Sequence, residues 1–391
     1  MRIVLLTHNY EPEVGAPQRR WSGFVRRFVE AGHSVNVLTA QPHYPAGRLL
    51  PGATPTWRAA PGRHGETVVR LPYVPYGPGT GRRMLDQLLT AGTSMLPGPA
   101  RRGDVVIATL PALPTLAAGQ LLARLNRAPL VVEMRDAWPD LVAESGVAPG
   151  RFGRTVSALI SAGQRRADAV VTTSSGFSEV LAARGVRNVV TLRNGVDVDS
   201  VPRSPVPPAT RDRLEVLYLG TIGRSQHVVG AVQAAAMAGD AVRLTVVGEG
   251  AARREVVAAA TRLDAPVRVL PPALGPALWE AYAGVDTCLM SLQAWPAFAY
   301  TVPSKLYELM ATGRHISAAV AGESAGIVTD ARAGDVVPPE DPAALAALWK
   351  TLADDRSRLD VGPGPRDWVA CNANPDLLAA RYLELLASLT G

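Results

Sequence analysis

The feature that most constrains the fold is a regular alternation of short apolar strands with amphipathic helices. Strands that alternate with helices form parallel sheets, because each helix carries the chain back to the same edge of the sheet. The first half of the chain therefore predicts one complete α/β domain. Its seven expected strands are 2–7, 34–40, 67–71, 104–109, 130–134, 169–173 and 189–192.

The same rhythm restarts after a break rich in proline and charge, as expected of a linker. A chain of 391 residues is long enough for two domains of ordinary size. We predict an N-terminal Rossmann-like domain at 1–193, a linker at 194–213, a C-terminal domain at 214–365 and a final helical segment at 366–391. Such sheets bind ligands at the carboxyl ends of their strands.

Composition narrows the class of protein. The hydrophobic content of 47% supports two full cores and argues against disorder. The net charge of +6 favours phosphate-bearing substrates or an anionic membrane surface, and the lack of an aromatic-basic repeat argues against nucleic acid. No apolar run reaches the length of a membrane span, and the chain begins with a strand rather than a signal peptide. We therefore expect a cytoplasmic protein.

The most informative stretch is FAYTVPSKLYELMATG, residues 298–313, which predicts a loop followed by a short helix. Lys305 and Glu308 stand three residues apart near the start of that helix, so they share one face. Free N–H groups and a lysine attract an anion, and a carboxylate one turn on can accept hydrogen bonds from hydroxyls. The pair fits a ribose-phosphate, although an ordinary ion pair fits the spacing equally well. The chain holds only one other lysine, Lys350, which favours a specific role for Lys305.

Part of this stretch, PSKLYELMATG, resembles the donor-site motif of the family-4 retaining glycosyltransferases, which have the GT-B fold of two Rossmann-like domains facing a cleft. The resemblance implies that Lys305 meets the donor diphosphate and Glu308 the ribose, with Thr301 and Ser304 nearby in the donor site. The family usually carries a further glutamate eight residues before the position of Glu308, and this chain has Tyr300 there. The identity of the sugar therefore stays open. The resemblance also implies that the final helix returns to the first domain.

Three weaker motifs of the same family lie in the first half. HNYEPEVGAPQRRW places Gly15 before a helix, QPHYPAG contains His43, and EMRDAWPD places Asp136 after a strand. The resemblance implies that Gly15 approaches the donor, that His43 faces the acceptor, and that Asp136 orients the acceptor hydroxyl or takes its proton. From the residues alone, Gly15 fits a plain turn, His43 a turn histidine without a role, and Asp136 a helix cap.

Two glycine loops in the second half complete the resemblance. YLGTIGRSQHVVG contains Gly223, which permits a tight turn, and Arg224, which could reach the diphosphate. VVGEGAAR places Gly248 at another strand-to-helix turn. A solvated loop arginine is the plain alternative for Arg224. Arg224 and Lys305 would be the main cations of the donor site.

We therefore expect a retaining glycosyltransferase that moves a hexose, such as an N-acetylamino or deoxy sugar, from a nucleotide diphosphate to a hydroxyl or amine. The donor is expected to be linked to UDP. The sequence shows no metal-binding signature, and we expect neither metal nor cofactor, because helix N-termini and basic side chains can neutralise the leaving diphosphate. The alternatives are a nucleotide-sugar epimerase of the same fold and a two-lobed sugar-binding protein without catalysis.

The acceptor is less constrained by the sequence. A small molecule, a carrier-bound group and a lipid-linked group all agree with the motifs. Residues 81–102 have the pattern of an amphipathic helix, which would suit peripheral contact with the inner membrane face, and a plain surface helix fits them as well.

Overall fold

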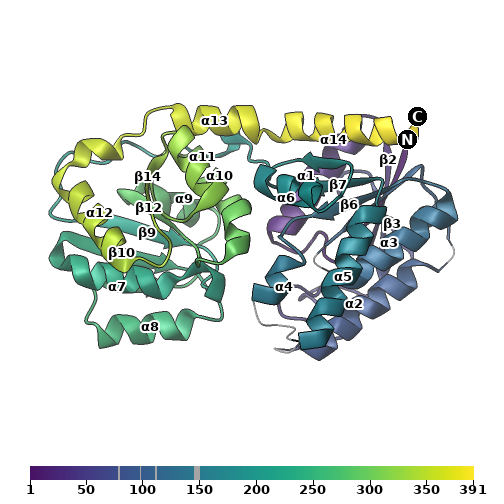
Figure 1. Ribbon diagram of the computed structural model, residues 1–391, viewed down its shortest axis with the longest axis horizontal. Coiled ribbons are helices and arrows are strands. Elements are labelled where there is room, and N and C mark those ends of the chain that lie inside the picture. Colours follow the sequence, from purple (N-terminus) through teal and green to yellow (C-terminus); the bar gives the residue numbers. More distant parts are fainter. Residues whose placement is uncertain (78–79, 97, 111, 145–149) are drawn as a thin grey trace. The chain divides into compact units, whose positions relative to one another are not determined.

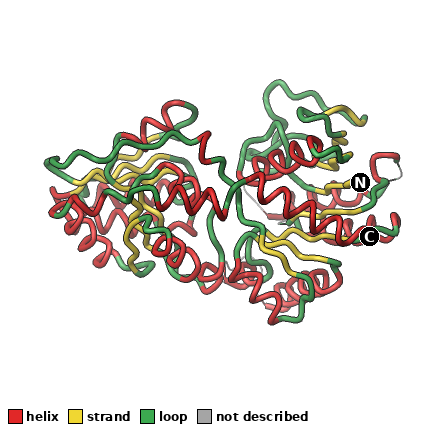
Figure 2. Tube along the Cα trace, turned by 90° about the horizontal axis from the view of Figure 1, so that it is seen from above, coloured by secondary structure: helices red, strands yellow, loops and turns green. Residues whose placement is uncertain are grey.

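The computed structural model describes residues 1–77, 80–96, 98–110, 112–144 and 150–391. The chain folds into two compact units. Unit 1 comprises Met1–Asn194 and Pro375–Gly391, and unit 2 comprises Gly195–Asn374. In each unit a parallel sheet, yellow in Figure 2, lies between helices on both faces. The predicted α/β class of two parallel-sheet domains is confirmed.

The sheet of unit 1 has eight strands in the order β3-β4-β2-β1-β5-β6-β7-β8. All neighbours are parallel except β3, a short edge strand absent from the sequence prediction, which pairs antiparallel with β4. The central strands are buried on both faces, which explains their continuous apolar runs. The strands are β1 Arg2–Leu6, β2 Ser34–Ala40, β3 Ala59–Pro61, β4 Thr67–Leu71, β5 Val105–Thr109, β6 Leu130–Met134, β7 Ala169–Thr172 and β8 Val189–Thr191.

The helices of unit 1 include one from the end of the chain. In Figure 1 this helix, α14, lies against α1. Tyr382 of α14 is fully buried and packs its ring against Phe24 and Phe28 of α1, at 5.3 and 5.7 Å between centroids. The helices are α1 Ala16–Glu30, α2 Thr80–Ser94, α3 Leu113–Asn126, α4 Asp140–Glu144, α5 Gly150–Arg166, α6 Ser175–Ala183 and α14 Pro375–Thr390, with a 3-10 turn η1 at Pro99–Arg101.

The sheet of unit 2 has six parallel strands in the order β11-β10-β9-β12-β13-β14. The edge strand β14 is an addition to the sequence prediction, because its short GDVV run carries little periodicity. The strands are β9 Leu214–Leu219, β10 Val242–Val247, β11 Val267–Leu270, β12 Thr287–Ser291, β13 His315–Ala319 and β14 Gly334–Val337.

The helices of unit 2 pack on both faces of this sheet, and α12 covers α7 through the fully buried Trp349. The final helical segment expected at 366–391 comprises most of α13, in unit 2, and the whole of α14, in unit 1, with a break before Pro375. The helices are α7 Val228–Ala238, α8 Arg253–Arg262, α9 Pro276–Ala283, α10 Ser304–Thr312, α11 Gly322–Asp330, α12 Pro342–Asp354 and α13 Gly364–Asn372. The 3-10 turns are η2 Val198–Ser200, η3 Arg224–Gln226, η4 Gly239–Ala241, η5 Pro296–Tyr300 and η6 Arg356–Leu359.

Strand order identifies where each unit should bind ligands. In unit 1 the chain runs outward from β1 through β2, and later resumes on the other side of β1 at β5. In unit 2 the same reversal separates β9 from β12. Ligands of open α/β sheets bind at the carboxyl ends of the strands beside such a reversal. The loops after β1, β9 and β12 therefore lie at the expected binding edges.

Candidate functional site

Helix α10 has the form that its sequence predicts. It begins after Pro303 and ends at Gly313, whose φ of 69° is the left-handed conformation that glycine favours at a helix end. The apolar side chains at helical spacing are all buried. Lys305 and Glu308 lie on the remaining face, where their side chains are 29% and 14% exposed. No side chain caps the N-terminus of α10, which leaves its first N–H groups without a side-chain partner among the described residues.

Lys305 and Glu308 form a small polar cluster with Tyr282, which comes from α9. The Lys305 Nζ donates hydrogen bonds to Glu308 Oε1 at 2.9 Å and to Tyr282 Oη at 3.1 Å. Tyr282 Oη in turn donates to Glu308 Oε1 at 2.8 Å. The ordinary ion pair considered from the sequence is therefore present. Because the pair is partly exposed, it is worth only about 0.2–1 kcal/mol and can be rearranged easily by a ligand.

The two glycine loops of unit 2 pack directly on one another. Gly220 N donates to Val247 O at 3.0 Å, and Ile222 N donates to Glu249 O at 2.8 Å. At Gly248, where φ is 153°, a Cβ would lie 1.9 Å from the carbonyl oxygen of Gly220. Only glycine allows this approach, so Gly248 shapes the loop after β9 through the backbone.

The loop after β9 also meets Lys305 and the loop after β12. A Cβ at Gly220 would lie 3.8 Å from Lys305 Cε, so the lysine stem runs beside this loop. Gly223 precedes the short turn η3, in which the exposed Arg224 stands. Gln293, from the loop after β12, donates from its amide side chain to Arg224 O at 2.9 Å. These contacts bring Lys305, Gly223 and the Arg224 backbone to one edge of the sheet.

The other predicted donor residues stand immediately before and at the start of α10. Tyr300 ends the turn η5, and Ser304 is the first residue of α10. Thr301 is held in place on both sides, because its hydroxyl donates to Ala297 O at 3.0 Å and its carbonyl accepts from Ser324 Oγ at 3.2 Å. The loop that leads into α10 is thus fixed by hydrogen bonds to the turn η5 and to helix α11.

In unit 1, Gly15 and Asp136 both lie after strands at the binding edge. Gly15 precedes α1 with a φ of 179°, an extended conformation that any residue adopts, so the backbone itself does not require glycine there. Asp136 is exposed in the turn between β6 and α4. Because α4 begins only at Asp140, Asp136 does not cap it. Its exposed carboxylate remains available to a ligand.

His43 differs from its prediction. The family resemblance implied that this side chain faces an acceptor, and a turn histidine without a role was the plain alternative, but the structure buries His43 completely. Its ring stacks on Tyr73 with 5.1 Å between centroids. The backbone N–H groups of His43 and Tyr44 both donate to Glu13 Oε1 at 2.8 Å, which joins the loop after β2 to the loop after β1. The imidazole of His43 is therefore not exposed at the surface of the described structure.

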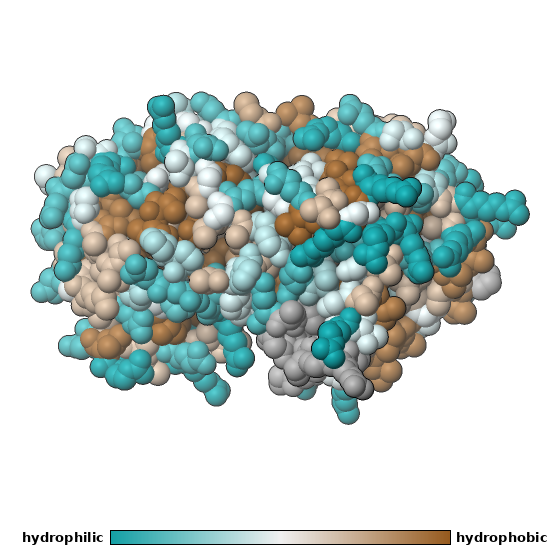
Figure 3. Space-filling view, viewed as in Figure 1, coloured by the Kyte–Doolittle hydropathy of each residue, from teal (hydrophilic) through white to brown (hydrophobic). Residues whose placement is uncertain are grey.

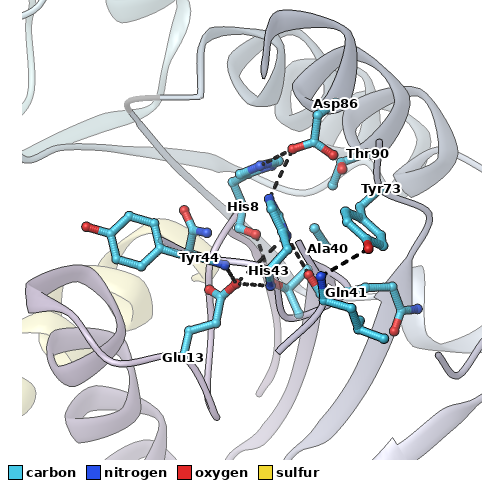
Figure 4. Close-up of polar contacts among 12 residues, drawn as sticks. His8, Glu13, Ala40, Gln41, His43, Tyr44, Tyr73, Asp86 and Thr90 are labelled. Atoms are coloured by element: carbon cyan, nitrogen blue, oxygen red, sulfur yellow. Dashed lines mark hydrogen bonds and ion pairs between the residues drawn. The ribbon is translucent and has the colours of Figure 1, made fainter. Parts of the chain in front are cut away.

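His43 belongs to a buried cluster that the sequence did not reveal (Figure 4). His8 Nε2 donates to Asp86 Oδ2 at 2.9 Å, and His43 Nε2 lies 3.2 Å from the same oxygen. Burial alone would raise the pKa of Asp86, but the two imidazoles hold it well below its usual range. Burial alone would also lower the pKa of His43, and the Asp86 carboxylate together with the carbonyl of Gln41 raises it instead.

A pocket of about 630 Å³ lies beside this cluster in unit 1, between the loop after β1, helix α1 and the β3–β4 edge. Its lining carries charges of both signs. The carboxylates are Glu11, Glu13 and Glu66, and the guanidinium groups are Arg19, Arg63 and Arg70. A lining of this kind suits a polar ligand with several hydroxyls.

Comparison with known proteins identifies the family. Residues 15–195 match the glycosyl transferase 4-like domain family, and residues 213–355 match the family described as glycosyl transferases group 1. The chain belongs to the family-4 glycosyltransferases. The predicted family is confirmed, and the comparisons favour a transferase over the alternatives of an epimerase and a sugar-binding protein.

This family-4 glycosyltransferase is similar in sequence to WcaI of Escherichia coli K12, a glycosyl transferase assigned to colanic acid biosynthesis. The two are 26% identical over 334 residues, which cover 80% of this chain and 82% of WcaI. Among solved structures, it resembles sucrose-phosphate synthase from Thermosynechococcus elongatus, with a TM-score of 0.76, 19% identity, and coverage of 99% and 98% of the two chains.

It also resembles HepE of Anabaena, whose complex with UDP-glucose matches with a TM-score of 0.71 and 18% identity over 100% of both chains. At these identities the likeness shows the fold, and the predicted GT-B fold is confirmed.

Proposed function

We propose that this glycosyltransferase transfers a hexose from a UDP-linked donor to an acceptor hydroxyl or amine, with retention of the anomeric configuration. The observation that carries the proposal is the position of Lys305 and Glu308 at an uncapped helix N-terminus, beside the glycine loop after β9. The HepE structures with UDP and with UDP-glucose support a UDP-linked donor by analogy of fold.

The donor diphosphate would bind at the start of α10. There it meets the N–H groups at the start of the helix, the positive end of the helix dipole and the Lys305 ammonium. The phosphate replaces Glu308 as the partner of Lys305 Nζ. Glu308 keeps its hydrogen bond from Tyr282 and accepts hydrogen bonds from the ribose hydroxyls. The exposed Arg224 adds a second positive charge as the diphosphate departs.

Retention follows if the acceptor attacks from the face that the diphosphate leaves. The bond between the anomeric carbon and the phosphate oxygen breaks, the bond to the acceptor oxygen or nitrogen forms, and the acceptor proton passes to a phosphate oxygen of the leaving UDP. The exposed carboxylate of Asp136 would orient the acceptor group. Charge stabilisation of the diphosphate by Lys305, Arg224 and helix α10 supplies the main lowering of the barrier, and we propose that no metal takes part at this site.

The exposed side chains of helix α2 support the proposal of an acceptor at a membrane surface. It buries polar residues, including Asp86 and Thr90, and exposes Leu85 and Leu88 by 54% and 53%. Two arginines precede these leucines in the exposed first turns. Figure 3 shows hydrophobic side chains, in brown, among hydrophilic ones over the helices of this unit. No helix of the described residues is long and apolar enough to cross a membrane.

An outward apolar face flanked by arginines suits shallow contact with an anionic lipid surface. A lipid-linked acceptor on the inner face of a membrane is therefore proposed. Sedimentation with vesicles should show binding to anionic lipid that Leu85→Glu reduces, and equal sedimentation of both proteins would contradict this part.

The test of the function is a thermal-shift panel of nucleoside diphosphates and nucleotide sugars, followed by proton NMR of the product. At about 100 times its Kd a ligand adds about 2.7 kcal/mol of stability, which is easily seen. We expect a shift with UDP, a larger one with a single UDP-hexose, and a product with the anomeric configuration of the donor. Absence of a shift with every nucleotide would contradict the donor site, and an inverted product would contradict retention.

A further inference from the structure

The buried cluster of unit 1 brings three metal-ligating atoms to one point. His8 follows β1, His43 follows β2 and Asp86 stands on α2. His43 and Asp86 are fully buried and His8 is 9% exposed. His8 Nε2, His43 Nε2 and Asp86 Oδ2 all lie within 4.8 Å of one another. Figure 4 shows the two imidazoles directed at the same carboxylate.

The outer atoms of His43 and Asp86 are already oriented. His43 Nδ1 donates to the carbonyl oxygen of Gln41 at 2.6 Å, which turns Nε2 toward the cluster. Asp86 Oδ1 accepts from Val74 N at 2.8 Å, which turns Oδ2 toward it. Imidazoles that ligate metals are typically oriented through such a bond from the second ring nitrogen to a carbonyl. His43 and Asp86 therefore each present one oriented atom.

Two buried ring nitrogens of the cluster, His8 Nδ1 and His43 Nε2, lack a hydrogen bond among the described residues. His43 Nε2 is buried and has no hydrogen-bond partner among the described residues, although it lies 3.2 Å from Asp86 Oδ2. With Nδ1 committed as a donor to Gln41, a neutral His43 directs the Nε2 lone pair at a carboxylate oxygen. Two lone pairs that face each other in a buried site repel, and either a proton on Nε2 or a metal cation between the two atoms removes the conflict.

The two separations from Asp86 Oδ2 are close to those of tetrahedral coordination. Ligand atoms about 2.0–2.2 Å from Zn²⁺ in a tetrahedron lie about 3.3–3.6 Å from one another. The separations to Asp86 Oδ2 are 2.9 and 3.2 Å, within a few tenths of an ångström of this range, and the two Nε2 atoms lie within 4.8 Å of each other. Two imidazoles and a carboxylate are a donor set that suits Zn²⁺.

We propose that His8 Nε2, His43 Nε2 and Asp86 Oδ2 bind one Zn²⁺ ion, with water as the fourth ligand. Binding displaces the proton that His8 Nε2 donates to Asp86, and the neutral His8 ring then carries its proton on Nδ1. The ion ties α2 to the loops after β1 and β2. Its role is to hold these loops, which border the pocket of unit 1, rather than to take part in sugar transfer. The proposal departs from the sequence-based expectation of no metal.

The experiment uses the full chain without a histidine tag, stripped with EDTA and then dialysed against graded free Zn²⁺. Bound zinc is measured by mass spectrometry, and fold is checked by circular dichroism. We expect one ion per chain, and we expect His43→Gln and Asp86→Asn to weaken binding by at least about 100-fold, which exceeds the usual effect of losing an outer partner of a ligand. If those two variants do not fold, zinc binding is measured on the milder variant His8→Gln instead.

The control is Asp335→Asn, because Asp335 and His315 form a His–Asp pair at 3.0 Å in unit 2 without a second imidazole. The Asp335→Asn variant should bind one zinc ion per chain, as the unaltered protein does. A second readout is hydrogen exchange, in which zinc should increase the protection of residues 80–94 only in proteins with the intact cluster. Failure of the unaltered protein to bind zinc below about 10 µM, or equal binding by His8→Gln and the unaltered protein, would overturn the proposal.

Discussion

The polar clusters of the two units are built in opposite ways. In unit 2, Lys305 and Glu308 are neighbours on one short helix, partly exposed, beside loops shaped by glycine backbone. In unit 1, His8 and Asp86 are 78 positions apart, and they meet with His43 in the buried interior. The first cluster is local and accessible, and the second is assembled by the fold and enclosed.

The difference has an energetic consequence. A partly exposed ion pair contributes about 0.2–1 kcal/mol, so a ligand can replace one partner at little cost. Removing one member of a buried charged group leaves the others unpaired and costs about 3–5 kcal/mol. The Lys305 cluster is therefore suited to exchanging partners during turnover, whereas the Asp86 cluster is suited to holding segments of unit 1 together.

The largest expected effect follows from the backbone packing in unit 2. Gly248→Ala would place a Cβ against the carbonyl oxygen of Gly220 at a φ that disfavours alanine. We expect a loss of about 3 kcal/mol in the free energy of unfolding, measured by urea denaturation, together with loss of UDP binding. Gly326→Ala is the control, since a Cβ there meets nothing within 4 Å, and it should be neutral or slightly stabilising. Equal stability of the two variants would contradict the packing of the glycine loops.

A slightly smaller loss is expected at the buried cluster. Asp86→Asn keeps the shape of the side chain and removes the charge that the two imidazoles share, which should cost about 2–3 kcal/mol in zinc-free protein. The contrast between the buried cluster and the exposed cluster also predicts that the UDP affinity of this variant is unchanged. A loss below about 1 kcal/mol would mean that the buried and the exposed clusters do not differ as described.

The donor site predicts an effect on affinity with little effect on stability. Glu308→Gln retains an acceptor for Tyr282 and loses the charge that strengthens hydrogen bonds to the ribose. We expect UDP binding, measured by calorimetry, to weaken about tenfold, which corresponds to about 1.4 kcal/mol. Glu280→Gln, an exposed change on α9, should leave UDP affinity unaltered. If Glu308→Gln binds UDP as tightly as Glu280→Gln does, Glu308 does not contact the ribose.

The smallest effect is expected at the half-buried pair of unit 2. His315, with help from Arg358, lowers the pKa of Asp335. A carboxyl with a lowered pKa stabilises the fold above its unfolded pKa of about 3.9, and that stability is lost as the pH falls through the folded value. Asp335→Asn should therefore cost less than about 1 kcal/mol at pH 7 and still less at pH 3. A larger loss in the free energy of unfolding at pH 3 than at pH 7 would contradict the predicted direction of this effect.

The sequence was most informative where structure is local. The strands 34–40, 67–71 and 130–134 have the predicted bounds, because their apolar runs end at turn residues. The donor helix and the glycine loops were also predictable, since helix spacing and strand-to-turn junctions are set by neighbours in the chain. The edge strands β3 and β14 were not, because a short edge strand carries little periodicity.

The sequence was least informative where side chains meet across the fold. Asp86 stands in a helix whose pattern predicted an amphipathic surface, and nothing in its neighbourhood indicates that it points inward to His8 and His43. Tyr282 likewise joins Lys305 only because α9 and α10 pack together. Histidine spacing of the kind found in local metal motifs is absent here, so only three-dimensional proximity could identify the cluster.

The most direct test of the central claim is a calorimetric titration with UDP of the unaltered protein, Lys305→Ala and Lys350→Ala. These two residues are the only lysines of the chain, and Lys350 is exposed on α12, so the second variant controls for loss of one positive charge. The donor site predicts that Lys305→Ala binds UDP at least about tenfold more weakly, with an unchanged melting temperature, while Lys350→Ala binds as the unaltered protein does. Equal affinity in all three proteins would show that the diphosphate does not bind at the start of α10.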